Sequence, residues 1–448
     1  MADRVRVVPS ARRLMQSLRD LGYDLPSALA DLVDNSIAAR ATTVRIDVGF
    51  EGSASWIRIA DNGTGMTGSV LTEAMRYGTH RDGYDDQDLG KYGLGLKTAS
   101  MSQCRVLTVA SRHGTDGRVE IRRWDLDEVM KRDRWDLERP RAESCRRELL
   151  EPLDGHKGTV VMWERLDRVL AFDRPDGQAA ENALLRQCRE IDRHLAMVFH
   201  RFLAGEAARS LPLRILLNDS LIAPWDPFCR DERHTRELPT HELAVHEAGS
   251  THVVRVEPYL LPNKDCFSDA KAWEDAGGPK NWNAQQGFYI YRQDRLIQSG
   301  GWSRARTLDE HTKIARVAVL FDRGADERFG INVSKMRVVL PAELREDFKR
   351  IAADVAKKAN AAYRQIDGGQ KAKGSSHSAR TGGTSPGRRG APPLAERPDP
   401  SLRFVRRVVH TLQAELAGQP RLLRRLLLAL GKIDPAFSAA MRDVTKAS

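Results

Sequence analysis

The chain has 448 residues, enough for about three structural units of roughly 150 residues each. Hydrophobic residues make up 41% and charged residues 30% of it, which excludes wholesale disorder, collagen and coiled coil. No run of about 18 apolar residues predicts a membrane helix, and the charged N-terminus does not resemble a secretory signal. The five scattered cysteines contain no C-x-x-C pair. Together these features predict a reduced, cytoplasmic protein that does not span a membrane.

The net charge of +11 is concentrated near the C-terminus. Residues 368–448 hold 15 of the 72 lysines and arginines but 5 of the 61 acidic residues, which is +10 and leaves the rest at +1. Glycine, serine and proline form about half of Gly368–Pro400 and predict a flexible linker. Apolar residues at helical spacing in Leu402–Leu430 predict two short helices with arginine-rich faces. This basic tail could bind a nucleic acid or a partner, with a solvated helical face as the alternative.

The first informative pattern is a helix over Asp24–Arg40. Asp24 can cap it, and Pro26 suits its first turn. An apolar stripe marks the core face, and Asp31 and Asn35 lie on the other side. These two side chains are neighbours because they are four residues apart. A solvated polar face is the ordinary interpretation of such a pair.

Two strands follow, at Thr43–Val48 and Trp56–Ala60, and the second runs into the sequence DNGTGM. Asp61 stands at the strand end, where its carboxylate can accept a hydrogen bond from an exocyclic amine. Gly63 and Gly65 allow the backbone to approach a ligand closely. An ordinary Asp-Asn-Gly turn is the alternative.

A glycine-rich loop comes next, in the sequence LGKYGLGLKTASM. Gly90, Gly93 and Gly95 precede an expected helix start near Leu96, an arrangement typical of a phosphate cradle. The spacing nearly matches a Walker A loop, but Leu96 separates Gly95 from Lys97. Such a glycine string is weak evidence when taken alone.

The rest of the body mixes helices and strands. The patterns predict a long helix at Ala179–Leu203, a strand at Pro212–Leu217, a hairpin at Gly287–Ile297, a strand at Ile314–Phe321 and a helix at Pro341–Ala362. This mixture predicts α/β or α+β domains.

In this order the three motifs resemble those of the Bergerat-fold (GHKL) ATPases, the superfamily of gyrase B subunits, heat-shock chaperones, histidine kinases and MutL. The pair ALADLVDNSIAA and GKYGLGLKTASM is most similar to the bacterial MORC-like branch, and HKGTVVMW at His156–Trp163 resembles a fourth motif. The resemblance implies an α/β (α+β) two-layer sandwich that binds ATP at 1–170. It also implies a ribosomal-protein-like βαβ transducer at 171–367, before the linker at 368–401 and the helical tail at 402–448.

The resemblance implies ATP and Mg²⁺ as cofactors. Asn35 would give an oxygen to Mg²⁺, Asp61 would bind the adenine amino group, and residues 67–88 would form a lid. Lys335, in FGINVSKMRVVLP, would reach the terminal phosphate. An exposed loop lysine is the alternative, and Arg337 is the nearest basic substitute. The other implied contacts are Gly63, Gly65, Met66 and Thr159 around the base, and Gly90, Lys91, Tyr92, Gly93, Leu94, Gly95, Leu96 and Lys97 around the phosphates.

Asp31 takes the position of the general base, where most relatives carry glutamate. The shorter side chain withdraws the carboxylate by about one bond length, and a misplacement of about 1 Å can cost about a hundredfold in rate. Either the site is rebuilt to suit aspartate, or hydrolysis is slow and ATP acts mainly as a switch. Asp34 is the alternative base, although it lies about 60° round the helix from Asp31.

Three functions are compatible with this pattern or come into question for it. The resemblance favours an ATP-gated clamp that dimerises on ATP binding and holds DNA through the basic tail or the groove between protomers, in restriction, defence or a chromosome-associated role. A chaperone-like ATPase acting on protein clients is the alternative. A sensor histidine kinase is not expected, because too few residues precede the first motif for a phosphoacceptor hairpin. The basic tail favours an anionic partner over a protein client.

One segment imitates a metal site. His241 and His246, in HELAVH, are five residues apart rather than four, so they would not share a helix face. We expect no metal there.

Overall fold

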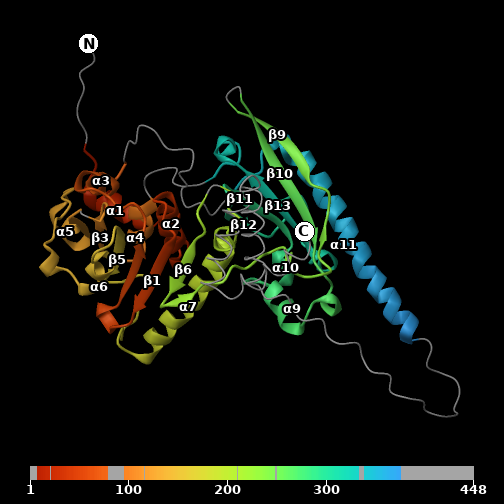
Figure 1. Cartoon of the computed structure of the whole chain (residues 1–448), viewed down its shortest axis with the longest axis horizontal. Helices are drawn as coiled ribbons and strands as arrows, with labels where there is room; N and C mark the ends of the chain where they lie inside the picture. The colour runs from red at the N-terminus through yellow and green to blue at the C-terminus, as the bar shows by residue number, and fades with distance from the viewer. Residues whose placement is uncertain are drawn as a thin grey trace, which may run out of the picture. The chain divides into compact units, whose positions relative to one another are not determined.

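The computed structural model in Figure 1 describes residues 8–20, 22–78, 95–115, 117–208, 210–247, 250–331 and 338–374. Two β-sheets organise these residues, and each has its own hydrophobic core. This architecture confirms the predicted mixed α/β fold class. The predicted tail helices, and the predicted linker beyond residue 374, lie outside the described residues.

The first sheet has the strand order β4-β3-β5-β2-β1-β6-β7 and is antiparallel except for the pair β1 and β6. Asp61, the last residue of β2, lies opposite Val44 on β1 and Thr159 on β5. The first two strands agree with the predicted ones. The strands are β1 Thr43–Gly49, β2 Trp56–Asp61, β3 Val106–Arg112, β4 Val119–Asp125, β5 Gly158–Glu164, β6 Arg214–Leu217 and β7 Ser220–Leu221.

The helices that share the main core with this sheet include α1 Ala11–Arg19, α2 Leu25–Ala38, α4 Gly95–Met101 and α7 Gln178–Val198. Helix α2 contacts both α4 and α7. As predicted, Asp24 caps α2, and its carboxylate accepts a hydrogen bond from Ser27 N over 2.8 Å. All residues of α2 except Asn35 and Ala38 are buried. The solvated polar face considered for this helix is therefore wrong at Asp31.

A smaller apolar cluster covers the other face of the sheet, where Leu149 and Leu153 pack against small residues of β2, β3 and β5. They come from α6 Arg147–Leu150 and the 3-10 turn Glu151–Leu153. Two further helices complete this part of the chain, α3 Gly68–Ala74 and α5 Leu126–Arg132. Helix α3 falls within the predicted lid, but it packs on β4 and buries Leu71 completely.

The second sheet has the order β12-β11-β13-β10-β8, with β9 also paired to β10. The predicted hairpin is present, and β11 runs parallel to β13. The segment between β12 and β13 holds a 3-10 turn at Glu310–Thr312 and, among its residues, no α-helix. Its strands are β8 Arg236–Glu237, β9 His241–Glu247, β10 Ser250–Leu260, β11 Gly287–Arg292, β12 Arg295–Ser299 and β13 Ala315–Phe321.

Two helices differ from their predicted bounds. The predicted helix at Ala179–Leu203 is interrupted at Phe199 and continues as α8 His200–Leu203. Val198 and Phe199 are weak helix formers, and the interruption lets His200 bond to Tyr291 on the second sheet over 2.9 Å. The last helix, α11 Arg345–Gly374, runs past the predicted end at Ala362. Ala, Lys, Arg and Gln, which are strong helix formers, make up half of that extension, although it also contains Gly368 and Gly369. The remaining helices are α9 Ala270–Ala276 and α10 Trp282–Gln285.

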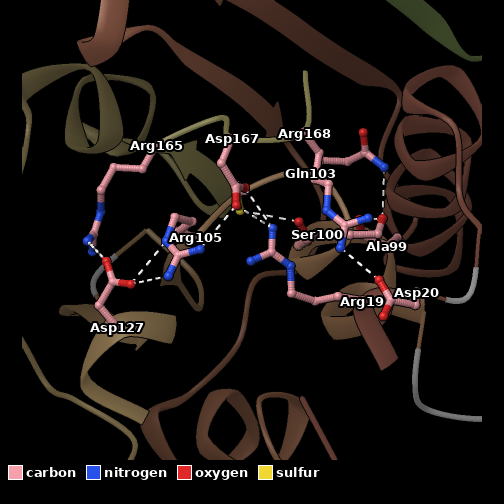
Figure 2. A network of polar contacts seen from close by, with 12 residues as sticks. Arg19, Asp20, Ala99, Ser100, Gln103, Arg105, Asp127, Arg165, Asp167 and Arg168 are labelled. Atoms are coloured by element: carbon pink, nitrogen blue, oxygen red, sulfur yellow. Dashed lines mark hydrogen bonds and ion pairs between the residues drawn. The ribbon is translucent and has the colours of Figure 1, made fainter. Parts of the chain in front are cut away.

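A chain of ion pairs between arginines and aspartates connects α1 to residues that flank β3 and β5 and to α5, as Figure 2 shows. Arg19 is only 5% exposed and bonds to Asp167 over 2.7 Å. Asp167 also lies 3.2 Å from Arg105, which bonds in turn to Asp127. Because Arg19 is buried and Asp167 half-buried, this pairing contributes more to the position of α1 than an exposed ion pair would.

Among the described residues, no helix is both long and apolar enough to cross a bilayer. All five cysteines are free thiols. The segment with His241 and His246 forms strand β9 rather than a helix, and the described residues contain no cluster of three metal-binding side chains.

Candidate functional site

Helix α2 brings the three predicted motifs together. Near its end, the Ser36 hydroxyl donates to Asp61 Oδ2 over 3.1 Å and so joins the helix to the end of β2. Near its middle, Asp31 Oδ2 lies 3.5 Å from the position that a Cβ on Gly95 would take. One helix therefore connects the DNGTGM turn to the end of the glycine-rich loop.

Asp61 is a half-buried carboxylate at one end of this arrangement. Its Oδ1 accepts a hydrogen bond from Gly63 N over 2.9 Å. Burial raises the pKa of Asp61 to about 6, while hydrogen bonds from Gly63, Ser36 and Thr159 act in the opposite direction. A ligand that donates a hydrogen bond to this group would stabilise its charged form.

Two glycines near Asp61 allow the backbone of the DNGTGM turn to lie close to the backbone of β3 and β5. A Cβ on Gly65, where φ is +67°, would lie 1.9 Å from the Arg112 carbonyl oxygen. A Cβ on Gly158, where φ is +146°, would lie 2.0 Å from the Asp61 carbonyl oxygen. Any side chain at these positions would therefore force the DNGTGM turn away from β3 and β5.

Ser111 is a polar residue of this region that the sequence analysis missed. Its hydroxyl contacts the Thr159 hydroxyl over 2.9 Å and accepts a hydrogen bond from Met66 N over 2.8 Å. It therefore connects two of the predicted base-pocket residues. The available signal was weak, since it consisted of one small polar residue in the buried strand β3.

Asp31 lies at the other end of the arrangement and is only 2% exposed. Tyr23, in the segment before α2, donates its hydroxyl to Asp31 Oδ2 over 2.8 Å. Burial and the nearby Asp31 charge raise the pKa of Tyr23 well above its usual range. The phenol therefore remains a donor at neutral pH and holds the carboxylate beside the start of α4.

Arg295 at the start of β12 also reaches α2, although the sequence analysis did not single it out. Its Nε donates to the two oxygens of Asp34 over 2.8 and 3.0 Å, and its Nη2 lies 3.8 Å from Asp31 Oδ1. Both oxygens of Asp34, the alternative base, thus face Arg295, whereas Asp31 Oδ2 faces Gly95.

Of the remaining predicted residues, some lie in the described part of the chain and the others lie outside it. Asn35 is exposed on α2, one turn after Asp31, while Leu96 is half-buried against the core. Lys97 is buried, and its ammonium donates to the Ala74 carbonyl over 2.9 Å. The predicted contacts outside the described residues are Gly90, Lys91, Tyr92, Gly93, Leu94 and Lys335, together with the substitute Arg337.

The donor set fits a magnesium ion that is carried by a nucleotide. An exposed amide oxygen on Asn35 is a hard ligand, and Mg²⁺ commonly takes one or two protein oxygens together with phosphate oxygens and water. A site made by protein alone finds no support in the described residues, which lack a cluster of three acidic, histidine or cysteine ligands.

The larger helices pack on one face of the first sheet, and one of them, α2, joins the glycine motifs; this arrangement is typical of a class of nucleotide-binding domain. Residues 23–159 match the sequence model of the histidine kinase-, DNA gyrase B- and HSP90-like ATPase family. Over 134 residues the chain is also 30% identical to a DNA mismatch repair protein MutL from Gemmatimonas aurantiaca. That match covers 28% of this chain and 22% of the length of the MutL protein.

These comparisons confirm the superfamily that the motifs predicted, for the segment that contains them. The MORC-like branch, the transducer assignment and the domain boundaries remain predictions.

Proposed function

We propose that this protein binds and hydrolyses ATP with Mg²⁺ at the site organised by α2. The observation that supports this most strongly is the double contact of α2, through Ser36 to Asp61 and through Asp31 to the start of α4. The two contacts would bring the base-binding and phosphate-binding motifs to one nucleotide. The family match over residues 23–159 supports the same class of ligand.

Each residue has a defined part in this proposal. Asp61 accepts a hydrogen bond from the adenine amino group, and Thr159 contacts the same side of the base. Asn35 gives an oxygen to the metal, and residues 90–97 surround the phosphates. Asp31 accepts the proton of the attacking water, while Lys335 approaches the terminal phosphate. Mg²⁺, when bound, would neutralise phosphate charge.

The proposal for Asp31 follows from its surroundings. Tyr23 donates to one carboxylate oxygen and Arg295 lies near the other. These contacts fix the orientation of the short side chain, which supports a site rebuilt to suit aspartate.

We further propose that the ATPase acts as a clamp that dimerises on ATP binding and holds DNA. Two observations support this choice over protein clients: the likeness of 134 residues of the chain to part of a DNA mismatch repair protein, and the net charge of +10 in residues 368–448. Lysines and arginines that contact phosphates release counterions, which drives binding to DNA.

One experiment tests both levels of this proposal. ATP hydrolysis is measured with and without duplex DNA, and the mass in solution is measured with a non-hydrolysable ATP analogue. We expect hydrolysis that DNA stimulates and a doubling of mass with the analogue. Hydrolysis that DNA does not change, but that an unfolded protein stimulates, would favour a chaperone-like function. Absence of both binding and hydrolysis would contradict the ATPase assignment itself.

A further inference from the structure

The turn between β11 and β12 is held in place by ion pairs on both sides. Gln293 and Asp294 form the turn, with φ values of 47° and 67°. Asp294 accepts hydrogen bonds from Arg201 on α8 and from Ala208 N, each over 3.0 Å. Before the turn, Arg292 forms a buried pair with Asp326 over 2.7 Å. The backbone that carries Arg295 is therefore fixed by contacts away from α2.

Arg295 extends from this turn onto α2 of the first sheet. Its side chain is 5% exposed, and its guanidinium lies 5.9 Å from the centre of the Phe199 ring. Its Nε bonds to the fully buried carboxylate of Asp34, and Nη2 lies 3.8 Å from Asp31 Oδ1. A single cation thus serves two acidic side chains that are three residues apart on one helix.

We propose that Arg295 is a positioning residue for Asp31, and that through it the second sheet controls hydrolysis at the nucleotide site. This inference rests on the proposed function. Two buried carboxylates this close repel one another, and the Arg295 cation compensates for that repulsion. Tyr23 fixes Asp31 Oδ2 and Arg295 attracts Oδ1, so the plane of the carboxylate depends on both.

The position of the hairpin should affect turnover. Arg295 belongs to a hairpin of the second sheet, whereas Asp31 belongs to a helix of the first. A shift of the hairpin relative to α2 would move the cation away from Asp31 without changing the contacts of Asp61. Turnover would then respond to the position of the hairpin, while recognition of the base would not.

The test must separate positioning from folding, because removing one member of a buried ion pair leaves an uncompensated charge and destabilises the protein. Arg295→Met alone is therefore insufficient. The double variant Arg295→Met/Asp34→Leu removes both members of the pair and replaces them with apolar groups, which can leave stability nearly unchanged. The matched control is Arg292→Met/Asp326→Leu, which removes the neighbouring buried pair from the same hairpin.

The measured quantities are ATP affinity, kcat and thermal unfolding of the full chain. For Arg295→Met/Asp34→Leu we expect kcat to fall about 10- to 100-fold while affinity stays within about threefold, as for a base displaced by about 1 Å. Arg295→Lys keeps a cation beside both carboxylates and should retain more of the wild-type kcat than this double variant. Asp34→Asn removes the alternative base but keeps Arg295, and it should also retain more of the kcat. The control double variant loosens the hairpin but leaves the contacts of Arg295 with α2 in place, so its kcat should fall much less.

Three results would contradict the inference. Wild-type kcat in Arg295→Met/Asp34→Leu would show that Arg295 serves only folding. An equal fall in kcat in both double variants would show that the hairpin acts only as a structural unit. If the wild-type protein neither binds nor hydrolyses ATP, the proposed function fails, and the inference fails with it. The first two results leave the proposed function standing.

Discussion

The affinity for ATP should fall as the pH drops through about 6, because ionised Asp61 accepts the hydrogen bond from the adenine amino group more strongly than the protonated acid does. Its pKa of about 6 results from burial. Below that pH most of the free protein carries a proton on Asp61, and ATP prefers the minor, ionised form. Each further unit of pH should then cost at most about tenfold in affinity, or about 1.4 kcal/mol.

The same carboxyl should affect the stability of the free protein. The ordinary pKa of this group is 3.8 and its value in the folded protein is about 6. Between these values the folded chain binds more protons than the unfolded chain. The stabilisation is therefore complete below pH 3.8 and is lost as the pH rises through about 6. The contribution of this group to the free energy of unfolding is at most about 3 kcal/mol, and it is smaller because solvent reaches the half-buried side chain.

The assay compares wild type with Asp61→Asn, which cannot ionise at this position. ATP affinity is measured by calorimetry from pH 5 to 8, and thermal unfolding is followed without nucleotide. The nucleotide phosphate also titrates in this range, so the ratio of the two affinities isolates Asp61. We expect wild type to gain up to about tenfold over the variant between pH 5 and 7, with a plateau above about 7. The variant should gain thermal stability over wild type as the pH rises. An affinity ratio independent of pH would refute this reasoning.

Three further changes have defined outcomes. Asn35→Ala should weaken ATP binding by at least about tenfold in the presence of Mg²⁺ and much less without it. Normal affinity with the metal would count against the site. Lys335→Ala should slow hydrolysis but preserve ADP affinity, and an equal loss of ADP affinity would indicate a folding defect. Deleting residues 375–448 should preserve basal hydrolysis but weaken DNA binding, which in the full chain should fall steeply between about 50 and 200 mM salt. An unchanged salt slope would move the DNA contact to the groove between protomers.

The parts of the fold that could be predicted from the sequence depend on local signals. Helix α2 begins where the Asp24 cap and Pro26 indicated, and β2 ends at Asp61 beside its glycine turn. The hairpin could be predicted because Gln293 and Asp294 separate two apolar runs. In each case the signal lies within a few residues of the element that it specifies.

The features that could not be predicted depend on packing between distant segments. Asp31 occupies the polar side of a helix, yet it is buried, with α4 packed on that helix and Arg295 near its carboxylate. Arg295 pairs with Asp34 across 261 positions of the sequence, a contact that no local pattern encodes. The interruption at Phe199 likewise accompanies a bond from His200 to the second sheet. Contacts between distant segments contribute at all three positions, and at Phe199 they act together with the weak helix preference of Val198 and Phe199.

The most direct test of the account compares ATP binding and hydrolysis in wild type and Asp31→Asn. The asparagine oxygen can still accept the hydrogen bond from Tyr23, which in wild type spans 2.8 Å to Asp31 Oδ2, so the pocket should be preserved. Binding should persist while turnover falls by about 10² or more, because the variant has no proton acceptor. Asp31→Glu should keep or raise the wild-type rate. Hydrolysis at the wild-type rate in Asp31→Asn would contradict the account and would make Asp34 the next residue to test.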